Sequence, residues 1–211
     1  MKKDEEIILK IITLGDSGVG KTSIIRRYVY DAFDLNTMTT LGLNFAFKDI
    51  TLKNGTNIKL KFIDTAGQEK FRSLSKNYIK NAEGVIFVFS FDAKEVNSFD
   101  HITEWVKLFD DAHNELENIP KYLVGNKNDC EEKGDIGENE INNLAEKMGG
   151  KFISVSAKEN NNISLLFEEL AEMMFKYVKL NKKQNTKKLG KYKKQKKSKC
   201  ELCNEYEEES I

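Results

Sequence analysis

A glycine-rich turn followed by a lysine and a threonine is the feature of this sequence with the clearest chemical potential. Residues 15–22 read Gly-Asp-Ser-Gly-Val-Gly-Lys-Thr and match the phosphate-binding pattern G-x-x-x-x-G-K-[ST]. Glycines let backbone N–H groups turn inward around phosphate oxygens, Lys21 can reach the β- and γ-phosphates, and the Thr22 hydroxyl can ligate Mg²⁺. A plain glycine turn with a surface lysine is the alternative. An apolar run before the turn and a helical pattern after it favour a nucleotide site.

Two further polar loops indicate which base this site reads. Asn126, Lys127 and Asp129 follow one apolar run, and Ser156-Ala157-Lys158 follows the next. The Asp129 carboxylate can accept hydrogen bonds from two adjacent N–H donors on guanine, whereas adenine presents an acceptor there. A mismatch of this kind discriminates by roughly 10⁴-fold. Alone, the pattern could be a polar turn; combined with the phosphate turn, it predicts guanine.

The string Asp64-Thr-Ala-Gly67-Gln68 supplies groups for catalysis and metal binding. Asp64 can hold Mg²⁺ through a water, and Gly67 can offer its N–H to a γ-phosphate. Gln68 can orient an attacking water and is the predicted catalytic residue. Thr40 is a candidate second hydroxyl ligand, so the predicted metal ligands are Thr22, Thr40 and Asp64.

These loops need a scaffold that brings them to one edge. Short β-branched runs alternate with helical patterns, which predicts an α/β fold of the P-loop NTPase kind. Its sheet should have six mostly parallel strands with helices on both faces. Asn54-Gly55 adds one antiparallel edge hairpin. Strands are expected at residues 7–14, 43–52, 58–63, 84–91, 122–125 and 151–155, and helices at 21–30, near 102–109, at 138–148 and at 164–180.

Length and composition limit the number of domains and the class of protein. The length of 211 residues suits one domain, residues 1–180, followed by a tail over residues 181–211. A formal net charge of zero gives no overall attraction to nucleic acid. Three cysteines are too few for a disulfide framework, and the apolar runs are too short for a secretory signal or a membrane span. A monomeric cytoplasmic protein is expected, with His101 and His113 as ordinary surface residues.

Together these residues resemble the Ras superfamily of small GTPases over positions 7 to 178. The resemblance implies GTP and GDP as ligands, Mg²⁺ as cofactor, and slow GTP hydrolysis that an activating protein accelerates. It implies that Phe33 and Lys127 contact the base, that Ala157 donates its N–H to it, and that Asn126 and Ser156 brace the loops. The nucleotide-binding set is then Ser17, Gly18, Val19, Gly20, Lys21, Thr22, Ser23, Phe33, Thr40, Asp64, Gly67, Asn126, Lys127, Asp129, Ser156, Ala157 and Lys158.

Within the superfamily the sequence is most similar to the Rab branch, through Asp-Thr-Ala-Gly-Gln-Glu-Lys-Phe-Arg-Ser-Leu and Trp105. This likeness implies a role in vesicle traffic, with an exchange factor and effectors that read two switch segments. Phe45 and Tyr78 match effector-facing aromatics, whereas Ile63 stands where Rabs carry tryptophan. A Ran-like soluble switch shares Thr-Leu-Gly before residue 43, and a GTP-binding scaffold without turnover is a third reading.

The tail departs from the Rab pattern. Ten lysines fall in residues 182–199, so this stretch is expected to be disordered. It could hold the protein weakly on an anionic membrane, or it could serve only as a solvated linker. Cys200 and Cys203 are followed by a glutamate-rich end instead of terminating the chain, and no C-a-a-X box exists. Prenylation is therefore not expected. Palmitoylation of these cysteines is left open, as is peripheral binding to endomembranes.

Overall fold

The computed structural model describes residues 6–35, 43–65, 78–113 and 119–181. Contacts divide the chain into two units, Met1–Phe175 and Lys176–Ile211, and the fold below is that of the first. Predictions that concern Thr40, Gly67, Gln68 or the lysine-rich tail lie outside the described residues. In the part of the chain that is described, no helix has the length and apolar character needed to cross a membrane.

A single six-stranded sheet organises the unit, in the order β2-β3-β1-β4-β5-β6. All neighbouring strands run parallel except β2 and β3. The strands are β1 (Ile8–Leu14), β2 (Leu43–Thr51), β3 (Asn57–Thr65), β4 (Gly84–Ser90), β5 (Lys121–Asn126) and β6 (Lys151–Ser154). The predicted fold class is therefore confirmed, including the antiparallel edge hairpin.

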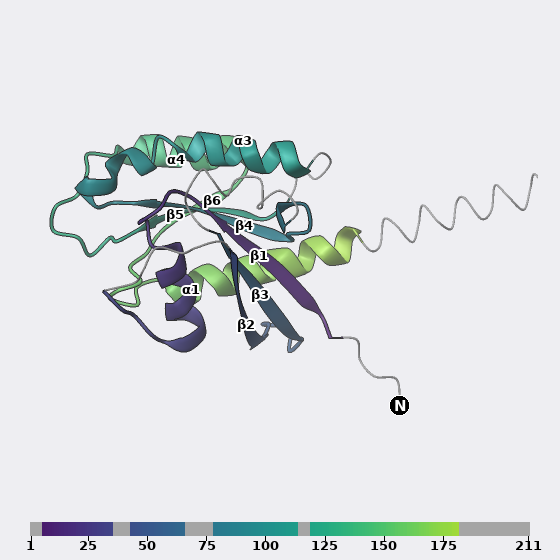
Figure 1. Ribbon diagram of the computed structural model, residues 1–211. Coiled ribbons are helices and arrows are strands. Elements are labelled where there is room, and N and C mark those ends of the chain that lie inside the picture. Colours follow the sequence, from purple (N-terminus) through teal and green to yellow (C-terminus); the bar gives the residue numbers. More distant parts are fainter. Residues whose placement is uncertain (1–5, 36–42, 66–77, 114–118, 182–211) are drawn as a thin grey trace, which may run out of the picture. The chain divides into compact units, whose positions relative to one another are not determined.

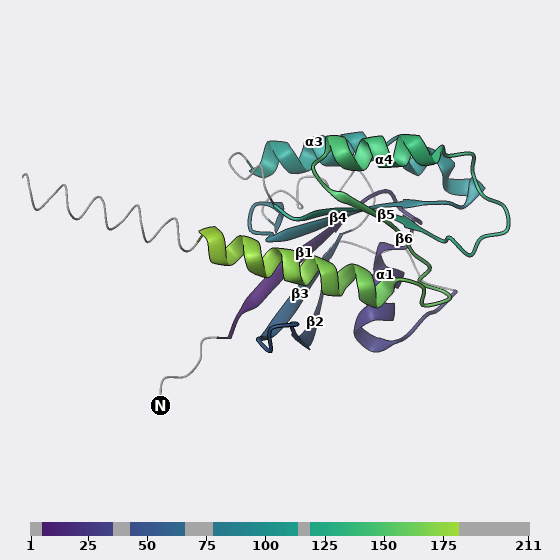
Figure 2. The ribbon, with the colours of Figure 1, turned by 180° about the vertical axis from the view of Figure 1, so that it is seen from behind.

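Helices cover both faces of the sheet, as predicted. Figure 1 shows α3 (Ile102–His113) and α4 (Glu138–Lys147) on one face, and Figure 2 shows α1 (Lys21–Tyr30) with the last helix on the other. The last helix spans residues 163–181, and a short 3₁₀ segment, η2 (Ala93–Ser98), lies between β4 and α3. Strand β4 is buried along its whole length, because helices cover it on both sides.

The hairpin between β2 and β3 corrects one predicted boundary. Its turn lies at Asn54-Gly55, as expected, with Gly55 at φ 79°. However, β3 continues to Thr65, two residues beyond the predicted end, because Asp64 and Thr65 pair with Asn44 and Leu43 of β2. The Thr65 hydroxyl also donates to the Thr13 carbonyl at 2.6 Å. Asp64 is therefore held within a strand, not in the loop after it.

The core beneath α1 is an aromatic cluster. Phe167 of the last helix is fully buried, and its ring centroid lies 4.5 Å from that of Tyr28 and 5.1 Å from that of Phe62. Edge-on and tilted pairs at such distances are favourable beyond their buried area. These rings fix α1, and with it the turn that precedes α1, against the sheet.

Replacing Phe167 with alanine is expected to lower the free energy of unfolding by about 3–5 kcal/mol, because it leaves a cavity between Tyr28 and Phe62. Urea denaturation measures the loss. Leu165→Ala is the control on the same helix, since Leu165 is 47% exposed and should cost far less. Equal losses for the two variants would contradict this account of the core.

Candidate functional site

The turn between β1 and α1 is shaped by close approaches that only glycine permits. Gly15 has φ 145°, and a Cβ there would lie 2.2 Å from the Val88 carbonyl oxygen of β4. Gly20 has φ 93°, and a Cβ there would lie 2.3 Å from the Asn126 amide nitrogen. The turn is thus pressed against the carboxyl ends of β4 and β5. Gly20 brings no capping side chain to the N-terminus of α1, so the N–H groups of that first turn suit an anion.

Lys21 occupies the centre of this turn. It is 5% exposed, and its ammonium donates to the carbonyls of Gly15 at 2.8 Å and Asp16 at 2.7 Å. Burial lowers the pKa of Lys21 to about 8, and the carboxylates of Asp64 and Asp16 offset part of this decrease. A buried ammonium of this kind gains from an added anion, because phosphate oxygens would replace the hydration it has lost.

Thr22 and Asp64 meet beside Lys21. The Thr22 hydroxyl donates to Asp64 Oδ2 at 2.6 Å, and the Thr13 hydroxyl lies 3.5 Å from Oδ1. Burial raises the pKa of Asp64, and the hydrogen bond from Thr22 and the charge of Lys21 oppose that rise. No group of three or more His, Cys, Asp or Glu side chains gathers anywhere in the described ranges. One carboxylate plus a hydroxyl suits Mg²⁺, which takes its remaining oxygens from phosphates and water.

Asn126, the last residue of β5, joins the phosphate turn to the loop that is predicted to read the base. Its amide donates to the Val19 carbonyl at 2.8 Å, and its oxygen accepts from the Ala157 N–H at 3.2 Å. The three residues are separated by 107 and 31 positions in the sequence, so the sheet alone brings them together. The two loops therefore cannot shift independently.

Asp129 lies in the loop that would read the base. Ser156 donates its hydroxyl to Asp129 Oδ1 at 2.5 Å, and the Lys158 ammonium lies 3.6 Å from Oδ2. Asn128 donates its N–H to the Val155 carbonyl at 3.1 Å, which ties the same loop to the end of β6. The carboxylate is thus oriented by two groups of the loop that follows β6.

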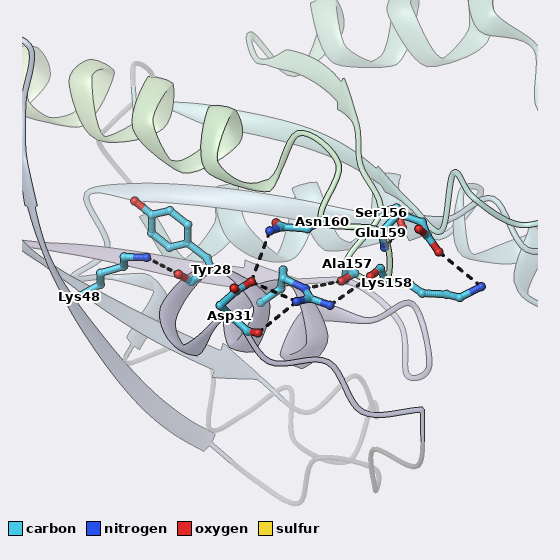
Figure 3. Close-up of polar contacts among 9 residues, drawn as sticks. Tyr28, Asp31, Lys48, Ser156, Ala157, Lys158, Glu159 and Asn160 are labelled. Atoms are coloured by element: carbon cyan, nitrogen blue, oxygen red, sulfur yellow. Dashed lines mark hydrogen bonds and ion pairs between the residues drawn. The ribbon is translucent and has the colours of Figure 1, made fainter.

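The loop after β6 is also fastened to the end of α1. Asn160 donates to the Asp31 carboxylate at 3.4 Å (Figure 3). Glu159 donates its backbone N–H to the Ser156 hydroxyl at 2.9 Å. Arg27 donates to the carbonyls of Ala157 at 2.8 Å and Lys158 at 3.1 Å. No sequence pattern had pointed to Arg27, because its partners lie 130 positions away.

Figure 3 further shows Lys48 of β2 reaching the carbonyl of Tyr28 near the other end of this region. The ring of Phe33, expected to contact the base, lies 5.8 Å from the Arg27 guanidinium. Arg27 therefore contacts both the loop that contains Ala157 and the ring of Phe33.

Two acidic residues, Asp92 just before η2 and Glu95 within it, lie beside the phosphate turn and Lys127, and no sequence motif indicated them. The Lys127 ammonium pairs with Glu95 and lies 3.7 Å from Asp92 Oδ2. Glu95 also faces the phosphate turn, since its Oε1 lies 3.0 Å from where a Cβ of Gly18 would stand. His101 is exposed, as expected, but it contacts Asp16. No local sequence pattern could indicate these contacts, because each joins segments that are distant in the sequence.

The structure therefore brings most of the predicted residues to one edge of the sheet. Ser17 and Gly18 are exposed in the turn, Val19 is buried, and Ser23 lies in the first turn of α1. Thr40, Gly67 and Gln68 fall outside the described residues. The arrangement could hold phosphates and a divalent cation, and it orients the carboxylate of Asp129 in the loop that is predicted to read the base.

Comparison with known proteins gives the same picture. Residues 10–176 match the Ras family. The chain is 36% identical over 169 residues to the GTP-binding protein ypt2 of Schizosaccharomyces pombe, covering 80% of this chain and 82% of that protein. It is 36% identical over 171 residues to the Ras-related protein Rab-10 of Diplobatis ommata, covering 81% and 83%.

It is also 37% identical over 183 residues to the Ras-related protein SEC4 of Saccharomyces cerevisiae, covering 85% of this chain and 81% of that protein. Each of these alignments covers 80–85% of this chain. The chain therefore belongs to the Ras family, as a Rab-like small GTPase.

Proposed function

We propose that this protein is a Rab-type molecular switch that binds GTP and GDP with Mg²⁺, hydrolyses GTP and regulates vesicle traffic. The single observation that carries the proposal is the Asn126 amide, which bonds both Val19 and Ala157. Through it, one strand end fixes the phosphate cradle and the base-reading loop as a single site. In this assignment Asp129 reads guanine, and Thr22, Thr40 and Asp64 hold the metal.

The Ran-like alternative is not favoured, because the relatives reported above carry Rab, Ypt and Sec4 names. A scaffold without turnover would have no need of Gln68, which the sequence retains. Slow hydrolysis, stimulated by an activating protein, is therefore the proposed reaction. When bound, Mg²⁺ neutralises charge on the phosphates, while Lys21 and the turn hold them in place.

Effectors are proposed to read the outer face of the hairpin next to the switches. The rings of Phe45 and Tyr78 lie 5.6 Å apart, and Phe45 and Phe47 are 43% and 50% exposed. The Lys61 ammonium lies 4.6 Å from the Phe45 ring and 5.8 Å from the Phe47 ring. Ile63, in register with Phe45 and standing where Rabs carry a third ring, is only 1% exposed. This surface therefore combines two exposed phenylalanine rings with the Lys61 ammonium and lacks the third ring.

We propose that the chain consists of a G domain, residues 1–180, and a hypervariable tail, residues 181–211. The lysines from Lys182 to Lys199 would attract an anionic leaflet by about 1 kcal/mol each when close to it. A cytoplasmic protein with peripheral binding to endomembranes follows from this, with Cys200 and Cys203 as candidate palmitoylation sites.

A single-turnover experiment tests the proposed reaction. Full-length protein loaded with GTP and Mg²⁺ should release phosphate slowly, and Gln68→Leu should slow this release by about tenfold or more because the attacking water loses its orienting group. Phosphate release detected with a fluorescent phosphate sensor gives the rates.

The control for Gln68→Leu is its affinity for GDP, which should equal that of the wild type, since Gln68 serves the γ-phosphate reaction only. Unchanged hydrolysis in the variant would remove Gln68 from the mechanism. A wild type that prefers ATP, or binds no nucleotide, would refute the proposed function as a whole.

A further inference from the structure

Asp16, the second residue of the phosphate turn, carries a side chain that none of the roles above uses. Its carbonyl accepts from Lys21, but its carboxylate faces away, toward α3. Oδ1 accepts from the Trp105 indole N–H at 2.8 Å, and Oδ2 lies 2.6 Å from His101 Nδ1. One carboxylate thus joins the turn to two side chains that are 89 and 85 positions distant in sequence.

Helix α3 is a rigid support for this contact. Ile102, Trp105 and Phe109 are each at most 2% exposed, and the Phe109 ring packs edge-on against Phe87 of β4 at 5.8 Å. His101 directly precedes α3, and its carbonyl accepts from the Trp105 N–H at 3.2 Å, so the two side chains project from one helical turn. A buried indole N–H needs a polar partner, and Asp16 supplies it.

We propose that Trp105 and His101 are positioning residues that clamp the phosphate turn through Asp16 and slow nucleotide release, and that protonation of His101 tightens this clamp. The inference rests on the proposed function, because it concerns nucleotide held by that turn. Neither residue would touch the nucleotide; both act through the position of Asp16. A turn fixed at Gly15 and Asp16 keeps the Lys21 ammonium and the N–H groups of the turn pointed at the phosphates.

The charge on His101 matters because Asp16 is an anion in a turn built for anions. Its carboxylate therefore repels the phosphates that the turn would hold. An imidazolium facing Asp16 offsets this repulsion, whereas a neutral imidazole can only donate a hydrogen bond. The hydrogen bond and charge of Asp16 raise the pKa of His101, and the nearby carboxylates of Glu104 and Asp100 raise it further. Slight burial opposes the rise.

The direction of the pH response follows from this raised pKa. The contribution of the charged pair is complete below the ordinary histidine pKa and disappears as the pH rises through the raised one. Nucleotide release should therefore quicken between pH 6 and pH 9. Because His101 is half exposed, solvent screening keeps the effect modest.

The test is release of a fluorescent GDP analogue from full-length, Mg²⁺-loaded protein between pH 6 and pH 9. His101→Asn keeps a donor for Asp16 but cannot become charged, so at pH 6 it should release nucleotide about two- to fivefold faster than the wild type and match it at pH 9. Trp105→Phe keeps the ring but loses the N–H, so it should release faster at every pH while retaining the pH response. His113→Asn, at the only other histidine, is the control and should behave as the wild type.

Each outcome decides the matter. If His101→Asn showed the same ratio of release rates at pH 9 and pH 6 as the wild type, the role of the histidine charge would be overturned. A Trp105→Phe variant that binds nucleotide and releases it at the wild-type rate would overturn the clamp. A wild type that fails to bind the analogue would instead refute the proposed function, which distinguishes the two failures.

Discussion

Replacing Asp129 with asparagine is expected to convert a guanine site into a xanthine site. Ser156 holds one carboxylate oxygen of Asp129 at 2.5 Å, and asparagine can keep that bond through its own oxygen. The second acceptor becomes an N–H donor, which would face the N–H donors of guanine. Xanthine presents a carbonyl at the corresponding place, so it pairs with the asparagine while guanine does not.

The loss of GDP affinity should be roughly 10³–10⁴-fold, with a gain of similar size for xanthosine diphosphate, because unpaired buried polar groups discriminate at about this level. Competition against a fluorescent nucleotide gives both affinities. Glu131→Gln, which removes one charge from an exposed position of the same loop, is the control and should change neither. If Asp129→Asn kept its preference for GDP, the base would have to be read by other groups.

Replacing Lys21 with methionine is expected to separate stability from binding. At neutral pH, lowering the pKa of Lys21 to about 8 costs the nucleotide-free protein about 3 kcal/mol, since the buried ammonium must stay charged. Methionine removes that cost but leaves two carbonyls without their donor, which costs about 1 kcal/mol each. The nucleotide-free variant should therefore be about 1 kcal/mol more stable than the wild type.

Binding should change in the opposite direction. The variant loses the charged donor to the phosphates, so its affinity for GDP should fall about 100-fold or more. Urea denaturation with and without GDP and Mg²⁺ measures both effects in one experiment, because a ligand stabilises only in proportion to its binding. Lys151→Met, at an exposed lysine, serves as the control. A less stable nucleotide-free variant that GDP still protects would contradict this view of Lys21.

These two predictions share a cause. The site holds polar groups in an arrangement that suits a ligand better than it suits the protein alone. These are the buried ammonium of Lys21, the buried carboxylate of Asp64 and glycines in left-handed conformations. Strain and burial of this kind are typical of functional sites, where binding returns the free energy that folding spent. Tyr122 illustrates the contrast, because its hydroxyl donates to Glu169 at the far side of β5 and needs no ligand.

The sequence alone determined the fold class and the order of strands and helices along the chain, and it indicated which loops are candidates for contact with a ligand. Residues 15–22 and the group around Asp129 are local strings whose chemistry depends on neighbours in the chain, so spacing was enough to recognise them. Helix α1 was predicted to the residue, because the glycine turn and the apolar spacing mark its start and extent. The hairpin at Asn54-Gly55 was predicted for the same local reason.

Tertiary structure alone decided how those loops are held. The end of β3 at Thr65 depends on pairing with Leu43, which lies across the hairpin. The bonds of Asn126 to Val19, of Arg27 to Ala157 and of Trp105 to Asp16 join residues 89 to 130 positions apart. Such contacts are set by how helices and strands pack over the whole sheet, a property of the folded chain that no local string encodes.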